Sequence, residues 1–504
     1  MIHDLRQFPR NSRLKADVCV VGSGAGGLTT AMVAAEAGLR VVVLEAGGWF
    51  TPEDMTQREE QMLPLLYWDA AGRTTADRRI RLHQGKGVGG STLHNLNLCK
   101  RIDRDVLSQW RGLGHLPPTQ WDALFAEAET MLGLTVVPRS DWNRHNRLLQ
   151  SACEKLGWRW SGLAHNREGC VGSGFCELGC AFDAKNNAAK VLLPRAIDRG
   201  AIVIHHAAAM RIEMDANRAV AVQACVTDEA GDKGERWLTV QADQIAVAAS
   251  ATGTPALLLR SQVPDPYSVT GKSLHIHPAV VAAGVFDDPV NAWLGIPQTV
   301  ECTEFLRPSD HSSSPSRIWI VPAFGHPMGT ATLMPSFAAQ HREFMLNYPR
   351  LAVFCAMLHD ETPGTVTPAG DTGVSVDYRL TEPDKQQLRA GLQRLGEALF
   401  AAGARQVWIP TPEPLVLTSP GQLKNLATVD VELLGPTAVH PMASCPMNDD
   451  PRLGPVDSTG KHHHVEGLWI ADGSLYPTSI GGPPQLGIYA LGLHVGRHLV
   501  AAAR

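Results

Sequence analysis

The run from Gly85 to Asn95, GKGVGGSTLHN, places several glycines beside hydroxyl, amide and imidazole side chains. Glycines such as Gly90 let the backbone approach a flat ligand with no side chain in the way. Ser91 and Asn95 supply hydrogen-bonding groups, and His94 adds a nucleophilic imidazole. This combination fits a flat, polar ring such as a flavin. A glycine-rich surface loop without a ligand is the alternative.

An N-terminal segment has the pattern of a βαβ unit that binds a dinucleotide. The pattern is a β-branched strand, a glycine turn, a small-residue helix and a second strand, at residues 17–21, 22–27, 28–37 and 40–45. The turn GSGAGG matches G-x-G-x-x-G through Gly22, Gly24 and Gly27, and the helix start after it would hold a pyrophosphate. Glu45 ends the second strand, where an acid binds ribose hydroxyls. The pattern does not distinguish NAD from FAD.

Size and charge narrow the function classes. The chain has 504 residues, enough to bury about three quarters of its extended surface. It carries 45 basic and 50 acidic residues and no basic run with interleaved aromatic residues, so nucleic acid is not an expected partner. No apolar stretch reaches the roughly 18 residues that cross a bilayer, and the N-terminal residues lack an apolar signal core. We therefore expect a soluble, cytoplasmic protein that is not an integral membrane protein.

The rest of the chain mixes helical and strand patterns. A helical, Trp-rich stretch, three strands and a small-residue turn that opens a helix follow at residues 106–132, 201–205, 219–227, 244–248 and 249–261. Residues 278–433 hold short strands, many prolines and one amphipathic helix, 382–402, with Thr381 as its cap. The last segment predicts a strand at 468–472 and a closing helix at 484–499.

Four segments together resemble the glucose-methanol-choline (GMC) family of FAD-dependent oxidoreductases. They are GSGAGG with Glu45, GKGVGGSTLHN, ASATGTPALLLRS, and the C-terminal pair HPMASCPM and LWIADGSLYPTS, which runs into GGPPQ. The segments occur in the family's order and reach both ends of the chain. Residues 280–430 contribute little to the match.

The resemblance implies an α/β fold with two parts. One is a non-contiguous, Rossmann-like FAD-binding domain, expected at residues 1–110, 185–277 and 434–504. The other is an α+β substrate-binding domain and cap, built on an antiparallel sheet and expected at residues 111–184 and 278–433. In this family the sheet of the second domain faces the flavin ring.

The resemblance also implies a reaction. His440 heads the segment that corresponds to the family's H-P-x-G-T motif, whose histidine acts as base while an alcohol passes a hydride to flavin N5. An imidazole with a pKa near ambient pH suits that task, and the product is an aldehyde or ketone. The expected cofactor-binding residues are Gly22, Gly24, Gly27, Glu45, Gly90, Ser91, His94, Asn95, Asp472 and Gln485. The electron acceptor stays open between oxygen, a quinone and a cytochrome.

Pro483 departs from the family pattern. It stands where members place asparagine or histidine beside the substrate oxygen, and proline offers neither a side-chain donor nor a backbone N–H. A lost hydrogen bond to a charged oxygen weakens its stabilisation by roughly 1.5 to 3 kcal/mol. A flavin-containing lyase of the same fold is therefore an alternative function.

Two histidine positions carry further expectations. His94 aligns with the histidine that holds FAD covalently in relatives of choline oxidase, whereas other relatives bind FAD reversibly, so both modes stay open. His275 and His277 match the family's histidine-proline loop after the central helix. We expect these two to be structural rather than catalytic.

Three cysteines lie close together among glycines, at Cys170, Cys176 and Cys180. Thiolates at this spacing ligate an iron-sulfur cluster or a zinc ion. The spacing resembles the large subunit of membrane-linked, FAD-dependent glucose dehydrogenases, in which such cysteines hold a cluster that passes electrons to a cytochrome. The chain as the catalytic subunit of such a complex is a second alternative function. Reduced structural thiols, or one disulfide, without a metal are the simpler interpretation.

Overall fold

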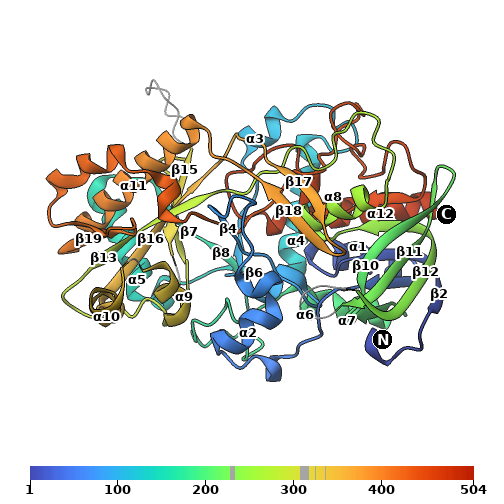
Figure 1. The fold of residues 1–504 in the computed structure, drawn as a ribbon, viewed down its shortest axis with the longest axis horizontal. Helices are drawn as coiled ribbons and strands as arrows, with labels where there is room; N and C mark the ends of the chain where they lie inside the picture. Colours follow the sequence, from blue (N-terminus) through green and yellow to red (C-terminus); the bar gives the residue numbers. More distant parts are fainter. Residues whose placement is uncertain (228–232, 307–316, 324, 335) are drawn as a thin grey trace.

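The computed structural model describes residues 1–227, 233–306, 317–323, 325–334 and 336–504. They form an elongated molecule with two lobes, and both chain ends lie in the same lobe (Figure 1). That lobe contains the N-terminal βαβ unit and the C-terminal helix. The chain therefore leaves it for the second lobe and returns.

The first lobe is built on an eight-stranded sheet of order β1-β9-β3-β2-β12-β11-β10, with β22 paired to β12. Its strands are β1 Ile2–Asp4, β2 Ser12–Val21, β3 Val41–Leu44, β9 Ile202–His205, β10 Ala208–Asp215, β11 Arg218–Thr227, β12 Lys233–Val247 and β22 Leu468–Ile470. β10, β11 and β12 pair antiparallel, and the other pairs are parallel. Apolar runs such as VVVL in β3 suit strands that are covered on both faces. The predicted α/β, Rossmann-like fold is confirmed.

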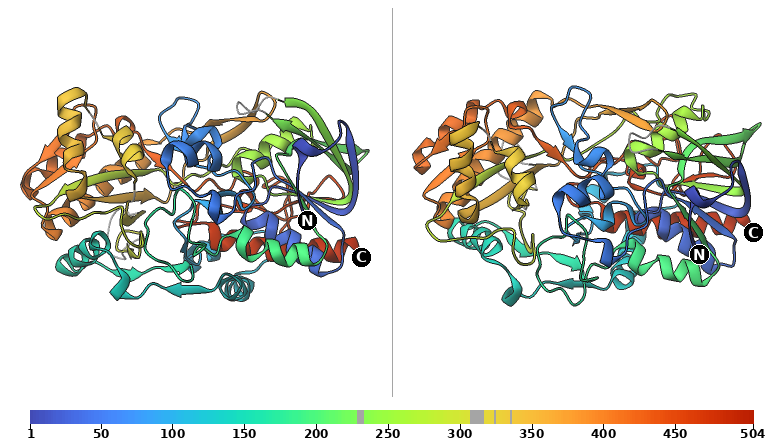
Figure 2. Two further views of the ribbon diagram at one scale, coloured as in Figure 1. Left: turned by 90° about the horizontal axis from the view of Figure 1, so that it is seen from below. Right: turned by 60° about the horizontal axis from the view of Figure 1, so that its bottom comes forward.

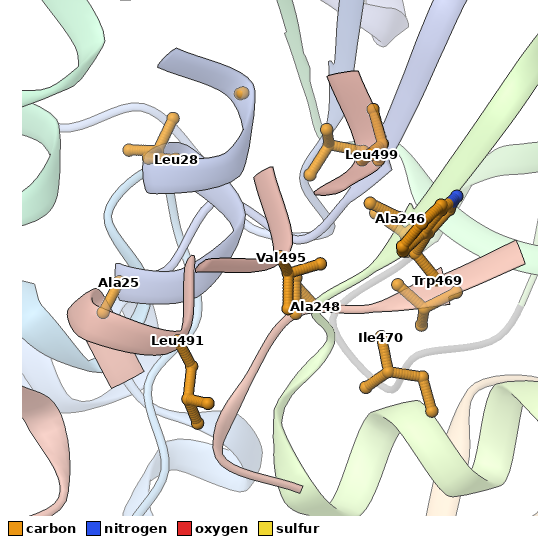
Figure 3. Close-up of a cluster of buried hydrophobic side chains, with 14 of the residues drawn as sticks. Ala25, Leu28, Ala246, Ala248, Trp469, Ile470, Leu491, Val495 and Leu499 are labelled. Atoms are coloured by element: carbon orange, nitrogen blue, oxygen red, sulfur yellow. The ribbon is translucent and has the colours of Figure 1, made fainter. Parts of the chain in front are cut away.

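The two chain ends meet in the core of this lobe. α1, Ala25–Glu36, packs along α12, Gln485–Ala503; both helices lie against β12, and α12 also lies against β22 (Figure 3). A Cβ added to Gly492 would lie 2.7 Å from the Cβ of Thr29, so a glycine is needed where the helices cross. α12 is long and apolar enough to cross a membrane, which was not expected from the sequence. However, 61% of its most apolar 18 residues are buried inside the protein. Its apolar side chains therefore form core.

The second lobe holds a nine-stranded sheet of order β20-β19-β13-β16-β15-β14-β7, with β21 paired to β13 and β4 paired to β21. Its strands are β4 Arg81–Leu82, β7 Trp160–Gly162, β13 Ala279–Val285, β14 Val300–Cys302, β15 Ile318–Pro322, β16 Leu351–Leu358, β19 Gln406–Ile409, β20 Leu415–Leu417 and β21 Thr437–Ala438. All pairs are antiparallel except β21 with β4. This is the antiparallel sheet that the family resemblance implied.

Two helices, α5 and α11, cover one face of this sheet. α11 spans Glu382–Ala402, the predicted bounds, and Thr381 caps it by accepting a hydrogen bond from the Asp384 amide. Leucines of α11 share a buried core with α5, Arg144–Leu156, and with the alternate residues of β13, β15 and β16 that point the same way. The opposite face of the sheet is left to line a cavity.

The segment from 111 to 166 belongs to both lobes. α4, Pro118–Leu132, buries Trp121 and Phe125 in the core of the first lobe beside α12, whereas α5 packs in the second lobe. Figure 2 shows this segment, in teal, running along one side of the molecule. α4 follows residue 111 and packs in the core of the first lobe, and the domain boundary expected at 111 stays a prediction. Gly112, with a φ of 71°, and two prolines also separate α3 from α4, where one helical stretch was expected.

The remaining regular elements lie along the chain between the strands of the two sheets. They are α2 Glu59–Leu66, α3 Arg104–Gln109, α6 Ala188–Val191, α7 Leu193–Asp198, α8 Ser250–Arg260, α9 Pro327–Leu333, α10 Ala338–Leu346, β5 Leu98–Cys99, β6 Leu134–Val136, β8 Ala164–Asn166, β17 Thr365–Ala369 and β18 Gly373–Asp377. Short 3-10 turns complete the chain, including η4 Gly90–Leu93 and η9 Gly473–Leu475.

Candidate active site

A cavity of about 1150 Å³ is lined by both lobes. The glycine loops of the first lobe form one side, and the open face of the second sheet forms the other. Every residue that the sequence analysis assigned to catalysis or cofactor binding lines this cavity except Gly27. Segments from both chain ends and the middle thus converge on one site.

The glycines of the first loop have different roles. Gly22 has a φ of 94°, and a Cβ added there would lie 2.2 Å from the carbonyl oxygen of Ala248. A Cβ on Gly27 would lie 2.0 Å from the carbonyl oxygen of Gly22. Gly24 instead has no atom within 4 Å of the place a Cβ would occupy. Gly22 and Gly27 therefore allow strand, turn and helix to pack, whereas Gly24 leaves room for a ligand.

The first glycine loop, residues 22–27, and the second glycine loop, residues 85–95, touch each other. A Cβ on Gly90 would lie 2.9 Å from the Cα of Gly24. The carboxylate of Glu45 joins the loops, because it accepts hydrogen bonds from the Ser23 hydroxyl at 2.6 Å and the Gly87 amide at 3.1 Å. Glu45 therefore organises the loops in this structure. Its predicted contact with a ribose stays a prediction.

His94 lies at the end of η4 and faces the cavity. Its Nε2 atom is buried and has no hydrogen-bond partner among the described residues. Its ring lies 3.9 Å from that of Tyr67, and burial together with the charge of Lys185 holds the pKa of His94 well below its ordinary value. Ser91, in the same turn, accepts a hydrogen bond from the Gly85 amide at 2.9 Å. The site therefore presents a neutral imidazole toward the cavity.

Two polar residues from the C-terminal segments close the site. Gln485, at the start of α12, accepts a hydrogen bond from the Asn95 side chain at 2.7 Å. Asp472 caps η9 by accepting from the Ser474 amide at 2.8 Å, and it also accepts from the Thr254 hydroxyl. Burial raises the pKa of Asp472. Asp472 thus acts as a turn-capping acid at the cavity wall.

His440 follows β21, and the pairing of β21 with β13 at Ala279 fixes its position. His440 lines the cavity, and its Nδ1 atom lies 3.3 Å from Nδ1 of His277. Its Nε2 atom is not engaged by any of the described residues. Burial lowers the pKa of His440 to about 3, below the near-ambient value that the sequence analysis expected, so the free imidazole is neutral at ambient pH. A neutral imidazole with an open nitrogen is able to accept a proton.

The second polar group expected beside His440 is not supplied by Pro483, which lines the cavity as a proline. His440 is paired instead with His277, from the loop between α8 and β13. His277 is fully buried and contacts His440 on the side away from the cavity. The sequence predicted a structural role for His277 and did not predict this contact.

The open face of the second sheet is an apolar wall. Its residues line the cavity in rows across β13, β16 and β15, and they are Ala279, Met357 and Trp319; Val281, Cys355 and Val321; and Ala283, Val353 and Ala323. The seven residues of β13 extend about 20 Å along this wall. Ala279 marks the end nearest His440, and Phe344 and Trp408 close the far end. The sequence did not reveal this wall, because the other face of the same strands is equally apolar.

The cysteine segment is tied to the second glycine loop by Lys185. The buried ammonium of Lys185 donates to the carbonyl oxygens of Leu93 at 2.9 Å, Asn95 at 2.6 Å and Cys176 at 2.8 Å. Burial lowers the pKa of Lys185 to about 8. The sequence does not point to Lys185, since nothing in its neighbourhood marks a lysine as buried.

The three cysteines are free and partly exposed. Sulfur ligands of one zinc ion lie about 4 Å apart. Within the described parts of the chain, Cys170, Cys176 and Cys180 do not form a group whose sulfur atoms all lie within 4.8 Å. A preformed mononuclear zinc site is therefore not present in these thiols, and the iron-sulfur alternative stays a prediction.

A Rossmann-type sheet whose cofactor cavity is closed by an antiparallel sheet defines a class of two-domain flavoprotein oxidoreductases. Family models described as GMC oxidoreductase match residues 22–279 and 361–492. The chain belongs to the GMC oxidoreductase family. It is accordingly an oxidoreductase enzyme of a family that binds FAD.

Relatives and solved structures agree with this assignment. The chain is 37% identical to an uncharacterized GMC-type oxidoreductase of Mycobacterium tuberculosis, over 97% of this chain and 76% of the relative. It is 28% identical to a long-chain-alcohol oxidase of Arabidopsis thaliana, over 94% of this chain and 65% of the relative. The crystal structure of pyridoxine 4-oxidase from Mesorbium loti has a TM-score of 0.72 at 17% identity, covering 96% of this chain and 98% of that one. The last similarity concerns the fold alone.

The residues of the cavity fit FAD. Gly24 leaves open space at the N-terminus of α1, where backbone amides favour a pyrophosphate. At the other loop, His94 Nε2 is a buried polar atom without a partner, and Asn95 and Gln485 present amides to the same cavity. These features suit the polar edges of a flavin ring.

Proposed function

We propose that this protein oxidises an alcohol with an apolar body to an aldehyde or ketone, with His440 as the base. FAD, when bound, supplies the acceptor for the hydride. The observation that carries the proposal is that His440 stands at one end of the apolar wall, in the same cavity as the glycine loops.

His440 has the properties of a base in this position. Its Nε2 atom is free of described partners, and its Nδ1 atom is held by His277 at 3.3 Å. Removal of the hydroxyl proton makes the adjoining carbon a better hydride donor, and a positioned base typically contributes about 10²- to 10⁴-fold to such a rate. The neutral state of His440 allows it to take that proton.

The wall supports an apolar substrate. Each buried methylene group of a ligand contributes about 0.8 kcal/mol, and the wall offers only carbon and sulfur surfaces over most of its length. A polyol would lose its hydrogen bonds to water there without replacement. Similarity to a protein named long-chain-alcohol oxidase is in line with this preference.

The experiment is anaerobic mixing of the purified holoenzyme with a panel of alcohols. We expect octanol and dodecanol to bleach the yellow flavin absorbance, and glycerol to leave it unchanged. Substitution His440→Ala should slow bleaching by about 100-fold or more with normal flavin content. His341→Ala, which removes a partly exposed imidazole of α10, is the matched control.

Two outcomes would contradict the proposal. Full bleaching rates in His440→Ala would remove this residue from the role of base. Product formed without any bleaching would favour the lyase alternative that Pro483 suggests.

The wall has its own test. Val281→Asp places a carboxylate in the middle row, where burial without a partner is costly. We expect the variant to lose its preference for dodecanol over butanol while bleaching with butanol persists. An unchanged chain-length preference would show that the apolar part of the substrate lies elsewhere.

The binding mode of FAD at His94 is decided by acid precipitation of the holoenzyme. Flavin that stays with the pellet in the native protein, and leaves it in His94→Ala, indicates a covalent bond. Flavin released from both indicates contact without a bond, as in relatives that lack this histidine.

A second candidate is a catalytic subunit that passes electrons through an iron-sulfur cluster to a cytochrome. The observation that favours it is the position of Lys185. Its ammonium donates hydrogen bonds to the carbonyl oxygen of Cys176 and to those of Leu93 and Asn95, and so links the cysteine segment to the second glycine loop. Iron content of the purified protein tests it. Activity with dyes but not with oxygen would agree with the candidate, and protein free of iron would contradict it.

A further inference from the structure

Behind His440, on the side away from the cavity, a chain of polar contacts ends on a carboxylate. Nδ1 of His440 lies 3.3 Å from Nδ1 of His277. Nε2 of His277 lies 2.8 Å from the Ser479 hydroxyl, which in turn donates to Asp360 at 2.9 Å. Four side chains thus form one continuous path.

The three residues behind His440 are sealed from solvent. His277 is 0% exposed, and Ser479 and Asp360 are each 1% exposed. They come from three separate segments, before β13, after β22 and after β16. Groups buried this completely interact in a low dielectric, where each polar contact is stronger than in water.

Other groups fix the carboxylate at the end of the path. Asp360 accepts hydrogen bonds from the Tyr378 hydroxyl at 2.8 Å and the Ile276 amide at 3.1 Å. Burial raises its pKa, but the contacts with His275 and the backbone outweigh burial and hold the pKa well below its ordinary value. The titratable and charged groups that face the path are His275, His359, Tyr378 and, through the His359 carbonyl, Arg317. Asp360 is therefore an anion that only accepts hydrogen bonds.

The anion sets the direction of the donors. A hydrogen bond to a charged acceptor is roughly twice as strong as a neutral one, so the Ser479 proton points to Asp360. The serine oxygen is then free to accept from Nε2–H of His277 at 2.8 Å. The Gly481 amide is directed at the same nitrogen as a donor from 3.1 Å. Protonation of Nε2 gives up this longer, neutral contact in favour of the shorter one that continues to the anion. With Nε2 protonated, Nδ1 of His277 accepts a proton donated by Nδ1 of His440.

We propose that His277, Ser479 and Asp360 are positioning residues that hold His440 with Nδ1 protonated and Nε2 free to act as base. This inference rests on the proposed function of His440. When His440 takes a proton on Nε2, the path carries the field of the Asp360 anion to the new imidazolium. The proton stays on His440, since the low pKa of Asp360 keeps that carboxylate charged.

The path has a measurable consequence for pH dependence. Without the hydroxyl that links His277 to the Asp360 anion, protonated His440 is less stable, so the acid limb of the flavin-reduction rate moves to lower pH. We expect Ser479→Ala to shift this limb downward by about one pH unit. The rate at the plateau should fall by about 10- to 100-fold, because one charge-linked hydrogen bond is lost. Ser479→Thr, which keeps a hydroxyl, should restore much of the plateau and return the limb.

The matched control is Ser444→Ala. Ser444 is equally buried and donates to the Ala251 carbonyl, outside the path. It should leave the limb in place. A Ser479→Ala variant whose plateau falls while the limb stays would show a structural role and overturn the proposal.

Nuclear magnetic resonance of the holoenzyme with labelled histidine tests the path without turnover. We expect neutral His277 protonated on Nε2 and neutral His440 protonated on Nδ1, with signals assigned from His277→Gln and His440→Gln. Loss of the His440 preference in Ser479→Ala would support the proposal. The opposite tautomers in the native enzyme would overturn it. If no alcohol reduces the flavin while these tautomers are observed, the proposed function fails and the positioning path stands.

Discussion

Asn95 and Gln485 are 390 positions apart in the chain, yet the Asn95 side chain donates a hydrogen bond to the Gln485 amide oxygen at 2.7 Å. This contact closes the cavity between the second glycine loop and the first turn of α12. Asn95→Ala leaves a buried acceptor without its donor, which costs about 1 to 3 kcal/mol. We expect FAD to bind the apoprotein roughly 5- to 100-fold more weakly, measured by fluorescence titration.

Asn347→Ala is the control for this prediction, because Asn347 donates to a carbonyl at the exposed end of α10. It should leave FAD affinity unchanged. Equal affinity of native protein and Asn95→Ala would mean that the pair does not shape the cofactor site.

Gly22 and Gly24 should respond differently to alanine. Gly22→Ala forces a Cβ to within 2.2 Å of the Ala248 carbonyl oxygen at a φ of 94°, so we expect a clear fall in the melting temperature of the apoprotein. Gly24→Ala meets no protein atom within 4 Å and should leave that temperature unchanged. Its methyl group points into the space assigned to the pyrophosphate, so flavin content after purification should drop. Full flavin content in Gly24→Ala would argue against that assignment.

Lys185→Met tests the link between the cysteine segment and the second glycine loop. Methionine keeps the volume but leaves the carbonyl oxygens of Leu93, Asn95 and Cys176 without their donor. We expect the free energy of unfolding to fall by about 2 to 5 kcal/mol and FAD to be held more weakly. Urea unfolding measures the first effect and flavin release the second. Lys424→Met, in an exposed turn, should change neither.

Buried histidines predict a loss of stability in acid. His145 and His494 are 2% and 1% exposed, and burial lowers the pKa of each to about 4. The unfolded chain binds a proton near pH 6.5 whereas the folded protein does so only near pH 4, so stability is complete above pH 6.5 and falls as the pH drops toward 4. Each histidine accounts for at most about 3 kcal/mol. Urea unfolding between pH 7 and pH 4.5 should be less pH-dependent in His494→Leu, and an unchanged slope would exclude this residue as a cause.

Local chemistry made several elements predictable. The glycine turn with its flanking β-branched and small residues predicted the β2-α1-β3 unit, because Gly22 and Gly27 are required by contacts within that unit. Thr381 and the apolar period after it predicted α11 at its observed bounds. The family motifs likewise predicted which residues line the cavity, since each motif carries its own turn geometry.

The sequence by itself therefore determined the N-terminal βαβ unit with its glycine turn, the capped helix α11 and the segments that reach the cavity. Tertiary structure alone decided that His277, Ser479 and Asp360 line up behind His440, because these residues come from three segments whose meeting depends on how two sheets pack. It also decided which face of β13, β15 and β16 packs on α11 and which lines the cavity. Both faces of these strands are apolar, so the alternation of side chains along each strand does not indicate which face packs on the helices.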